Sequence, residues 1–558
     1  MTTSPPIGRV KGPGEKAYEY TLITADTVQT KIGEFVYYET ALDGHVVPIL
    51  GKVIHRRLVR GLPDAFLTDA RIAPQAIAGV IGLHSPDAQL FEVVVSITGF
   101  FDPQLRDFIN PRIPPAPGTA VYLAPNAMLV GVLNARLPKS RGSAHVGSLL
   151  SRPSGDVPVV IDVKAMVSTH LAILASTGAG KSYTAGVLIE ELMKPYNRAA
   201  VLIVDPHGEY HTLKDTLENH PDFHEGSYRP QVAIFHEDKV KVRTSTLTYG
   251  DLCYLLPDLS EKMRFYLKKA HSEVKDAARR LGRAHSWGAA ELLNAVEGLQ
   301  DGRGEGDDTG KSSRDGLRWR LSSSLENSSL FDSHRHLDLN ELFQPGRVSV
   351  LQIHELDQRD QQIMVSTILR RVNKARIDTL RGNVQPGDEN HLDYPVFVLM
   401  EEAHRFAPAN AEVATTQILK TILAEGRKFG VGIGLITQRP GKLDGDVLSQ
   451  CMTQMIMRIV NPIDQGSIAA SVESAGRDLL DELPALSKGQ VIIAGAAVNT
   501  PVLVRVRARL SHHGGETVDA PAAWADYFSI GAESGRDQAE ALLVDPSQPQ
   551  AYFEGFPV

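Results

Sequence analysis

The chain has 558 residues, of which 42% are hydrophobic and 22% charged, and this composition excludes a mainly disordered chain, a collagen-like fibre and a coiled-coil rod. Its 58 lysines and arginines stand against 66 aspartates and glutamates, so the formal net charge of −8 excludes a generic basic nucleic-acid coat. The two cysteines support neither a disulfide framework nor a structural zinc site. Because the first residues lack a signal-peptide pattern and no apolar run spans a bilayer, we expect a cytoplasmic protein without a membrane partner.

Residues 1–145 contain short alternating or apolar runs that Gly, Pro and Asp interrupt, and this pattern predicts a small N-terminal β-barrel or sandwich. The runs that carry the prediction are 18–23, 33–38, 46–54, 91–98 and 121–124.

From residue 146 onward, apolar strand-like runs alternate with helical stretches, which predicts an α/β fold with a mostly parallel sheet. We assign residues 146–248 and 341–510 to two parts of this core, and the charged, helical residues 249–340 to an insertion. Within the insertion, residues 301–316 have the composition of a flexible loop. Residues 511–558 have few periodic apolar positions and are expected to form a tail or an inter-subunit arm. The expected core strands are 170–175, 199–205, 231–235, 347–353, 395–400 and 431–437, followed by a strand pair at 489–495 and 501–507.

Residues 175–182, ASTGAGKS, follow an apolar strand and precede a helical run, which is the context that a phosphate-binding loop requires. Backbone N–H groups of such a loop bind the phosphates of ATP, Lys181 adds positive charge, and the Ser182 hydroxyl binds Mg²⁺. Ala175 stands where the pattern usually has glycine, and it fits if its φ is negative. The predicted nucleotide-binding residues are Thr177, Gly178, Ala179, Gly180, Lys181, Ser182 and Tyr183.

Two carboxylates follow the apolar strand 395–400, at the position where a P-loop ATPase carries its acidic residues. Glu401 is expected to hold Mg²⁺ through water, and Glu402 to act as the general base that polarises the attacking water. The alternative is that the two glutamates cap a helix. A second acidic cluster, Asp205 and Glu209 in the motif DPHGEY, either faces the nucleotide or caps a turn, and the sequence leaves both readings open.

Gln438 follows the strand 431–437 and is the predicted sensor of the γ-phosphate, with Thr437 as the lesser candidate. Arg427 precedes the same strand in the motif EGRKFG, where it could project from the subunit edge as an arginine finger. From spacing alone, a surface cation is the stronger reading of Arg427.

Several other basic residues have no role that the sequence can assign. Arg370, Arg371, Lys374 and Arg376 lie on mixed faces of the predicted helix 358–378, where a solvated or inter-subunit face is a stronger reading than a DNA groove. His334 and His336 lack acidic or cysteine partners at metal-ligand spacing, so we do not expect a metal site there.

Taken together, the motifs ASTGAGKS, DPHGEY, EEAHRFAP, EGRKFG and ITQRP resemble those of the HerA group of hexameric ATPases, relatives of FtsK-type DNA pumps. The opening IGRV with GEFV at 33–36 resembles that family's N-terminal β-barrel, and the strand pair near Gly489 and Pro501 resembles its C-terminal part. The resemblance covers most of the chain. One departure is Glu401, where many P-loop ATPases carry aspartate.

This resemblance implies a RecA-like core in a homohexamer that uses ATP and Mg²⁺ to move double-stranded DNA. It implies a partner nuclease of the NurA type, or another effector protein, in DNA end processing or phage defence. It also gives Arg427 the role of a finger that reaches the nucleotide of the neighbouring subunit. The alternative function is a ring-shaped scaffold ATPase that orders and regulates an effector nuclease or sirtuin-like enzyme, with little translocation of its own.

Overall fold

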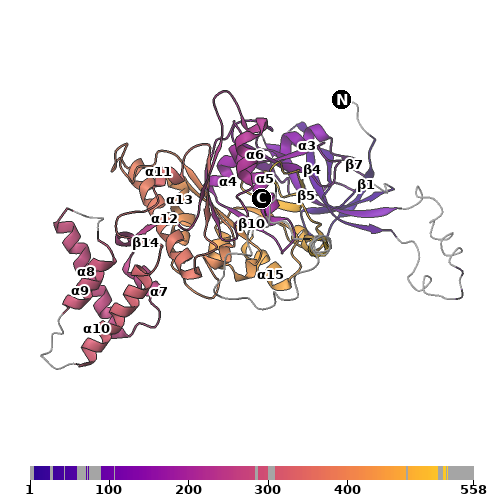
Figure 1. Ribbon diagram of the computed structural model, residues 1–558. Coiled ribbons are helices and arrows are strands. Elements are labelled where there is room, and N and C mark those ends of the chain that lie inside the picture. Colours follow the sequence, from indigo (N-terminus) through magenta and orange to yellow (C-terminus); the bar gives the residue numbers. More distant parts are fainter. Residues whose placement is uncertain are drawn as a thin grey trace, which may run out of the picture. The chain divides into compact units, whose positions relative to one another are not determined.

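The computed structural model describes residues 5–25, 29–42, 44–59, 71, 73, 90–102, 104–105, 107–282, 287–299, 308–472, 476–512, 514, 519–522 and 524–525 (Figure 1). The chain divides into two compact units, residues 1–513 and 514–558. In the second unit, the Ala522 amide donates a hydrogen bond to Asp519 Oδ1 at 3.1 Å. None of the helices in the described part of the chain combines the length and the apolar character that a membrane span requires.

Six antiparallel strands close into a barrel near the N-terminus, as the sequence predicted. They follow one another in the order β2-β1-β7-β3-β4-β5, and pairing of β5 with β2 completes the ring. The interior is apolar, and the rings of Tyr20 and Tyr38 meet edge to face in it, 5.6 Å apart. A seventh strand, β6, extends the sheet from β5. The strands are β1 Gly8–Pro13, β2 Glu19–Thr24, β3 Phe35–Leu42, β4 His45–Leu58, β5 Phe91–Asp102, β6 Asp107–Ile109 and β7 Ala120–Leu123.

A second, eleven-stranded sheet forms the core, in the order β12-β15-β11-β16-β17-β10-β18-β19-β20-β8-β9. The first seven strands are parallel and the rest pair antiparallel. One strand, β17, separates β10 from β16, which is the RecA-like arrangement that the sequence predicted. The bounds are β8 Ser143–Leu149, β9 Pro158–Asp162, β10 Leu171–Leu174, β11 Ala200–Asp205, β12 Gln231–Phe235, β15 Arg347–Gln352, β16 Val396–Met400, β17 Val431–Thr437, β18 Thr453–Ile456, β19 Gln490–Gly495 and β20 Val502–Val506; a separate two-stranded sheet pairs β13 Val242–Arg243 with β14 Phe331–Asp332.

Three strands of this sheet were not expected from the sequence. β18 is only four residues long, and two of its buried side chains, Thr453 and Gln454, are polar, so it carries no apolar strand pattern. The strands β8 and β9 also pair into the core sheet. The predicted division after residue 145 therefore falls inside β8, and the core begins before the predicted boundary, because β8 pairs with β20.

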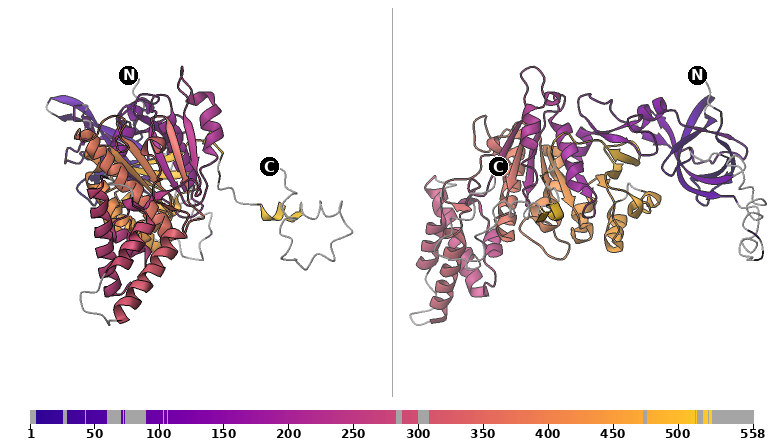
Figure 2. Two further views of the ribbon diagram at one scale, coloured as in Figure 1. Left: turned by 60° about the vertical axis from the view of Figure 1, so that its left-hand side comes forward. Right: turned by 45° about the vertical axis from the view of Figure 1, so that its right-hand side comes forward.

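Helices cover both faces of the core sheet (Figure 2). Alternate residues of β10 point to opposite sides, so Leu171 and Ile173 join the core under one set of helices, while Ala172 and Leu174 join the other. The first side includes α5 Lys181–Met193 and α6 Leu213–Asn219; the second includes α12 Gln358–Leu380 and α13 Thr416–Phe429. Shorter helices are α3 Asn126–Leu133, α4 Val163–Ser168, α14 Gly445–Ser449, α15 Pro462–Ser471 and α16 Arg477–Leu480.

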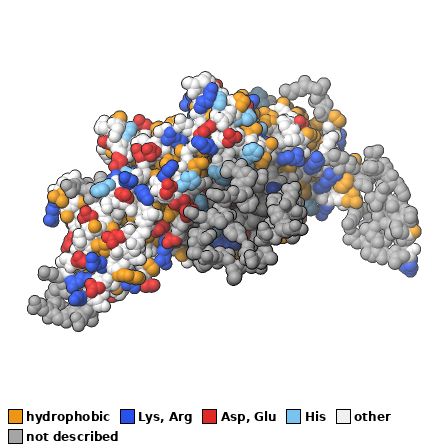
Figure 3. Space-filling model, viewed as in Figure 1, with side chains coloured by type: hydrophobic (Ala, Val, Ile, Leu, Met, Phe, Trp, Pro, Cys, Tyr) orange, Lys and Arg blue, Asp and Glu red, His pale blue; other side chains and the backbone are white. Residues whose placement is uncertain are grey.

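The insertion is helical, as predicted, and α8, α9 and α10 pack side by side (Figure 1). The predicted loop 301–316 is partly wrong: residues 301–307 lie outside the described part, but α10 already begins at Asp308. A Cβ atom at Gly316 would come within 2.8 Å of Met263 Cε on α8. Glycine disfavours a helix, but at this position it allows α10 to pack closely against α8. On the face in Figure 3, acidic and basic side chains intermingle over the insertion. Its helices are α7 Tyr249–Leu255, α8 Glu261–Arg280, α9 Ala289–Gly298, α10 Asp308–Leu321 and α11 Leu339–Leu342.

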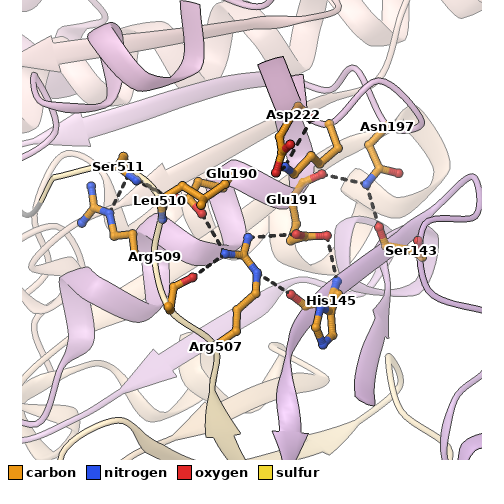
Figure 4. Close-up of polar contacts among 12 residues, drawn as sticks. Ser143, His145, Glu190, Glu191, Asn197, Asp222, Arg507, Arg509, Leu510 and Ser511 are labelled. Atoms are coloured by element: carbon orange, nitrogen blue, oxygen red, sulfur yellow. Dashed lines mark hydrogen bonds and ion pairs between the residues drawn. The ribbon is translucent and has the colours of Figure 1, made fainter. Parts of the chain in front are cut away.

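After β20, residues 507–512 run against α5, and we call this segment the C-terminal strap (Figure 4). Oε1 of the buried Glu190 accepts hydrogen bonds from the amides of Leu510 and Ser511 at 2.9 and 2.8 Å. Arg507 donates to Glu190 Oε2 at 2.9 Å and to Glu191 Oε1 at 2.8 Å. The strap therefore binds the helix that follows the predicted phosphate-binding loop, and the second unit begins after it.

We expect Glu190→Gln to lower the free energy of unfolding by about 3–5 kcal/mol, because it leaves the Arg507 guanidinium facing a neutral, partly mismatched amide in a buried site. Glu225→Gln is the matched control, since Glu225 pairs with Arg198 at 2.9 Å on the surface, and it should change stability by less than about 1 kcal/mol. Denaturant unfolding of both variants measures the difference. Equal effects of the two substitutions would show that Glu190 does not anchor the strap.

Candidate nucleotide-binding site

The loop between β10 and α5 has the backbone of a phosphate-binding loop. Gly178 and Gly180 adopt left-handed conformations, with φ of 78° and 104°, which glycine adopts without strain. Ala175 has no positive φ, so an alanine fits where the pattern usually carries glycine. Its amide donates to the Thr437 carbonyl at 3.3 Å, and the Ser176 amide donates to the Arg458 carbonyl at 2.9 Å. These bonds join the start of the loop to the end of β17 and to the segment that follows β18.

The loop presents free backbone donors. Among the residues that the structure describes, the amides of Gly178, Gly180, Lys181 and Ser182 find no hydrogen-bond acceptor. The first amides of a helix lack partners within it and carry the positive end of its dipole, so such a cradle suits phosphate oxygens.

Lys181 joins the loop to the two carboxylates. Its Nζ lies 2.7 Å from Glu401 Oε2 and 2.8 Å from Glu402 Oε1, and both glutamate side chains are almost fully buried. Neighbouring residues of an extended strand would point to opposite faces. Glu402 instead takes a left-handed conformation, with φ 49° and ψ 45°, and the chain turn brings both carboxylates to one ammonium group. This conformation costs a non-glycine residue of the order of 1 kcal/mol or more.

The alternative that the two glutamates cap a helix is not what the structure has. Glu402 precedes a single short helical turn, residues 403–405, and its side chain makes no capping hydrogen bond there. Glu401 still pairs with the sheet, because its amide donates to the Val204 carbonyl at 3.1 Å. Both carboxylates therefore face the loop at the carboxyl edge of the sheet.

The motif DPHGEY forms a turn that the Asp205 carboxylate holds. Its two oxygens accept hydrogen bonds from the amides of His207, Gly208, Glu209 and Tyr210, at 2.8–3.3 Å. Of the two readings that the sequence left open, Asp205 therefore follows the second: its carboxylate caps the turn. The turn places the buried Tyr210 so that its hydroxyl donates to Glu401 Oε1.

Gln438 lies beside the loop: the Thr177 hydroxyl donates to Gln438 Oε1 at 2.8 Å. Thr437 is buried, and its Oγ1 lies 3.1 Å from Nδ1 of His404. That same Nδ1 lies 3.3 Å from Glu402 Oε2. Hydrogen-bonding groups therefore run from the end of β17 to the carboxylates.

Arg427 lies outside this cluster. It is an exposed residue near the end of α13, and it makes neither a hydrogen bond nor an ion pair with the described residues. The helix leads into the start of β17, whereas the loop lies at the end of that strand. Seven residues of β17 span about 20 Å, so Arg427 cannot reach the loop of its own chain.

Burial dominates the electrostatics of the site. It raises the pKa of Glu401, and the Lys181 ammonium and the Tyr210 hydroxyl oppose only part of that rise. For Lys181, burial alone would lower the pKa, but Glu401 and Glu402 more than offset it, so the pKa lies above its usual value. Burial lowers the pKa of His404, which keeps the imidazole neutral near pH 7.

Sequence reasoning missed the contacts that support the site from behind. Tyr210 was read only as part of a motif, and its bond to Glu401 spans 191 positions of the chain. The strap was read as the end of a strand and the start of a tail, but the Arg509 amide donates to the hydroxyl of Tyr183, near the start of α5, at 2.6 Å. The sequence hinted at the first contact only because DPHGEY and EEAHRFAP occur together among the motifs that resemble the HerA group.

A glycine-dependent loop with free amides, a lysine at the start of the next helix and two carboxylates beside it define a P-loop nucleoside triphosphatase. Among the described residues, no group of three or more His, Cys, Asp or Glu side chains has metal-binding geometry. A magnesium ion here would depend on the Ser182 hydroxyl, phosphate oxygens and water, which suits its usual coordination.

Comparisons with known proteins give the family. The family model described as helicase HerA, central domain, matches residues 144–372. A probable helicase of Methanocaldococcus jannaschii is 31% identical over 75% of this chain and 76% of its own length. The DNA double-strand break repair helicase HerA of Pyrococcus furiosus is 28% identical over 93% of this chain and 96% of its own length. The chain belongs to the HerA helicase family of P-loop ATPases.

Solved structures are less similar. VirB4 of Thermoanaerobacter pseudethanolicus has 15% identity and a TM-score of 0.47, over 66% of this chain and 97% of its own. The bacterial conjugative coupling protein TrwB has 14% identity and a TM-score of 0.44, over 71% of this chain and 94% of its own.

We expect Lys181→Met to make stability fall as pH rises. Without the ammonium group, the buried Glu401 and Glu402 carboxylates have no counter-charge, and the pKa of Glu401, which burial already raises, rises further. A carboxyl whose pKa is raised by folding binds more protons when folded, so ionising it at higher pH costs stability. The loss against the parent protein should reach about 3–5 kcal/mol at pH 8 and shrink towards pH 5.

Denaturant unfolding at both pH values, without nucleotide, measures this loss. Lys420→Met is the control, because Lys420 also bridges two carboxylates, Asp444 and Asp446 at 3.0 Å each, but on the surface. It should show little dependence on pH. A loss for Lys181→Met that is the same at both pH values would contradict the assignment of Lys181 as the counter-charge.

Proposed function

We propose that the protein is an ATP-driven translocase or helicase that acts on double-stranded DNA as a ring of six identical subunits. The observation that carries the proposal is the Lys181 ammonium group, which lies within 2.8 Å of both Glu401 and Glu402 beside a loop with free amides. The DNA substrate and the ring come from the family, in which curated relatives are called DNA double-strand break repair helicases.

The residues of the site fit ATP and Mg²⁺. The free amides of the loop would bind the phosphates, Ser182 would ligate the metal, and Glu401 would hold it through water. Mg²⁺, when bound, neutralises phosphate charge and orients the phosphoryl group. The longer side chain of glutamate at position 401 favours a contact through water.

Lys181 would control the base. Its ammonium group donates hydrogen bonds to both carboxylates, so Glu402 is paired with a cation. The negatively charged phosphates of ATP would compete with the carboxylates for the Lys181 ammonium group. Once Lys181 binds the phosphates, Glu402 would be free to polarise the attacking water. Gln438, which is already bonded to Thr177 of the loop, would register the γ-phosphate and pass the change to β17.

Arg427 would complete the site of the next subunit. Its exposure, its lack of a partner among the described residues and its place at the opposite end of β17 all favour action on another chain. A guanidinium group supplied in this way stabilises charge in the transition state of phosphoryl transfer. Hydrolysis would then require a closed ring.

The family also suggests the setting. The names of the relatives, DNA double-strand break repair helicases, support a role in DNA end processing. The resemblance of the motifs to the HerA group adds a NurA-like nuclease as the partner. Another effector protein, in phage defence, is the alternative partner. The mass of the native assembly, alone and with any co-purifying protein, tests both the hexamer and the partner.

We expect linear duplex DNA to stimulate ATP hydrolysis by the isolated protein. Glu402→Gln should bind ATP with similar affinity but hydrolyse it at least about a hundredfold more slowly, because the amide cannot take a proton. Glu412→Gln, an exposed glutamate nearby, is the control and should behave as the parent protein. Stimulation that occurs only with an added effector would favour the scaffold alternative, and normal turnover by Glu402→Gln would move the base elsewhere.

Mixing variants tests the finger. Arg427→Ala should assemble and bind nucleotide but lose hydrolysis by about a thousandfold. In rings mixed from Arg427→Ala and Glu402→Gln subunits, the intact Arg427 of one subunit can serve the intact Glu402 of the other, so hydrolysis should partly return. If the mixed rings are as inactive as either variant alone, Arg427 does not act between subunits.

A further inference from the structure

A cavity of about 270 Å³ lies where the helical insertion meets the core. It opens between α12, the segment from β13 to the start of α7, and the residues 389–390 that follow α12. Four cationic side chains line it, with one acid and several hydroxyl groups. The charged residues are Arg243, Arg370, Arg371, Lys374 and Glu389, and we call this site the cationic pocket.

Two of the four cations are neutralised within the protein. Arg370 Nη2 lies 2.6 Å from the buried Asp251 Oδ2 on α7. Arg243 Nη2 lies 3.2 Å from Glu389 Oε2. These ion pairs account for both acids in contact with the pocket's cations.

The other two cations have no acid of their own. Arg371 donates to the Leu337 carbonyl at 2.6 Å, and its Nη2 lies 3.3 Å from His336 Nε2, which itself lies 2.8 Å from Glu389 Oε1. Lys374, one helical turn further along α12, is exposed and pairs with none of the residues that the structure describes. The cationic pocket therefore carries an excess of about two positive charges, which lie on one stretch of α12.

The neighbouring groups respond to this excess. Burial lowers the pKa of Arg371 to about 10; Glu389 and Asp338 oppose this shift, and Arg243 adds to it. Burial, Arg371 and Arg243 together lower the pKa of His336 to about 4, so this histidine is neutral and adds no charge. Its Nδ1 is buried without a hydrogen-bond partner among the described residues. Glu389 and Asp338 therefore compensate only part of the positive charge at these partly buried positions, where such charge is costly.

We propose that the cationic pocket binds a phosphate group. Guanidinium groups, an ammonium group and the Thr367 hydroxyl offer the donors that a tetrahedral oxyanion accepts in several directions. The excess charge matches a group of about −1.5 to −2. The volume lies just below the range of roughly 300–1,000 Å³ of pockets for whole small molecules, which favours a single group over an entire nucleotide.

A bound phosphate would join the insertion to the core. Arg243 precedes α7, Asp251 on α7 already pairs with Arg370 on α12, and the phosphate would bring Arg371 and Lys374 into the same network. The pocket is built from residues other than those of the ATP site, so its occupancy does not depend on the proposed hydrolysis.

Calorimetric titration of the full-length protein with inorganic phosphate tests the proposal. We expect two sites per chain, the P-loop and the cationic pocket, and only the first should be blocked by ADP with Mg²⁺. Lys374→Glu should weaken the ADP-resistant site at least about tenfold, because it reverses an unpaired charge at the pocket. Lys374→Ala should weaken it less, and Lys268→Glu, an exposed residue of α8, should leave it intact.

All three variants should keep the ATPase rate without DNA, since the pocket is separate from the P-loop. No ADP-resistant phosphate binding by the parent protein, or undiminished binding by Lys374→Glu, would overturn the proposal, whatever happens to hydrolysis. Loss of hydrolysis with phosphate binding retained would instead count only against the proposed function.

The source of the phosphate is decided by competition. If duplex DNA displaces inorganic phosphate from the pocket, and Lys374→Glu reduces the log–log salt slope of DNA binding by about 0.9, the ligand is the nucleic-acid backbone. If duplex DNA does not compete, the ligand is free phosphate or a small phosphorylated molecule.

Discussion

The structure depends on one buried interaction, the Lys181 ammonium group between the Glu401 and Glu402 carboxylates. Two adjacent carboxylates taken out of water would be costly unless a cation lay between them. The same cation is the one that phosphates would attract. The stability of the protein and its ability to bind the phosphates of a nucleotide therefore depend on the same positive charge, that of Lys181.

The architecture around this interaction serves to hold it in place. The carboxyl ends of β10, β17, β16 and β11 are neighbours in the sheet, so the loop, Gln438, the carboxylates and the DPHGEY turn meet at one edge. Asp205 fixes the turn through four backbone amides, and the turn places Tyr210 on Glu401. On the other side of the loop, the strap binds α5 through Glu190.

The charged residues of the insertion's base show a different balance. At the ATP site one cation, Lys181, forms ion pairs with two acids. At the cationic pocket only two of the four cations form ion pairs, each with one acid. An acidic chain with a formal charge of −8 can therefore still hold local excess positive charge. Net charge alone gave no indication of where that excess lies, because it does not show which acids pair with which cations; Asp251, for example, lies 119 positions from its partner Arg370.

The sequence alone determined the barrel, the parallel core, the phosphate-binding loop and the two glutamates, because each depends on a local pattern of apolar runs, glycines or motif spacing. It did not determine β18, whose polar side chains carry no strand pattern, or the helix that begins at Asp308. Only the tertiary structure decided that Asp205 caps a turn, that Tyr210 supports Glu401 and that the strap grips α5. The contacts of Tyr210 and of the strap join residues 191 and 321 positions apart, and no local pattern encodes such pairings.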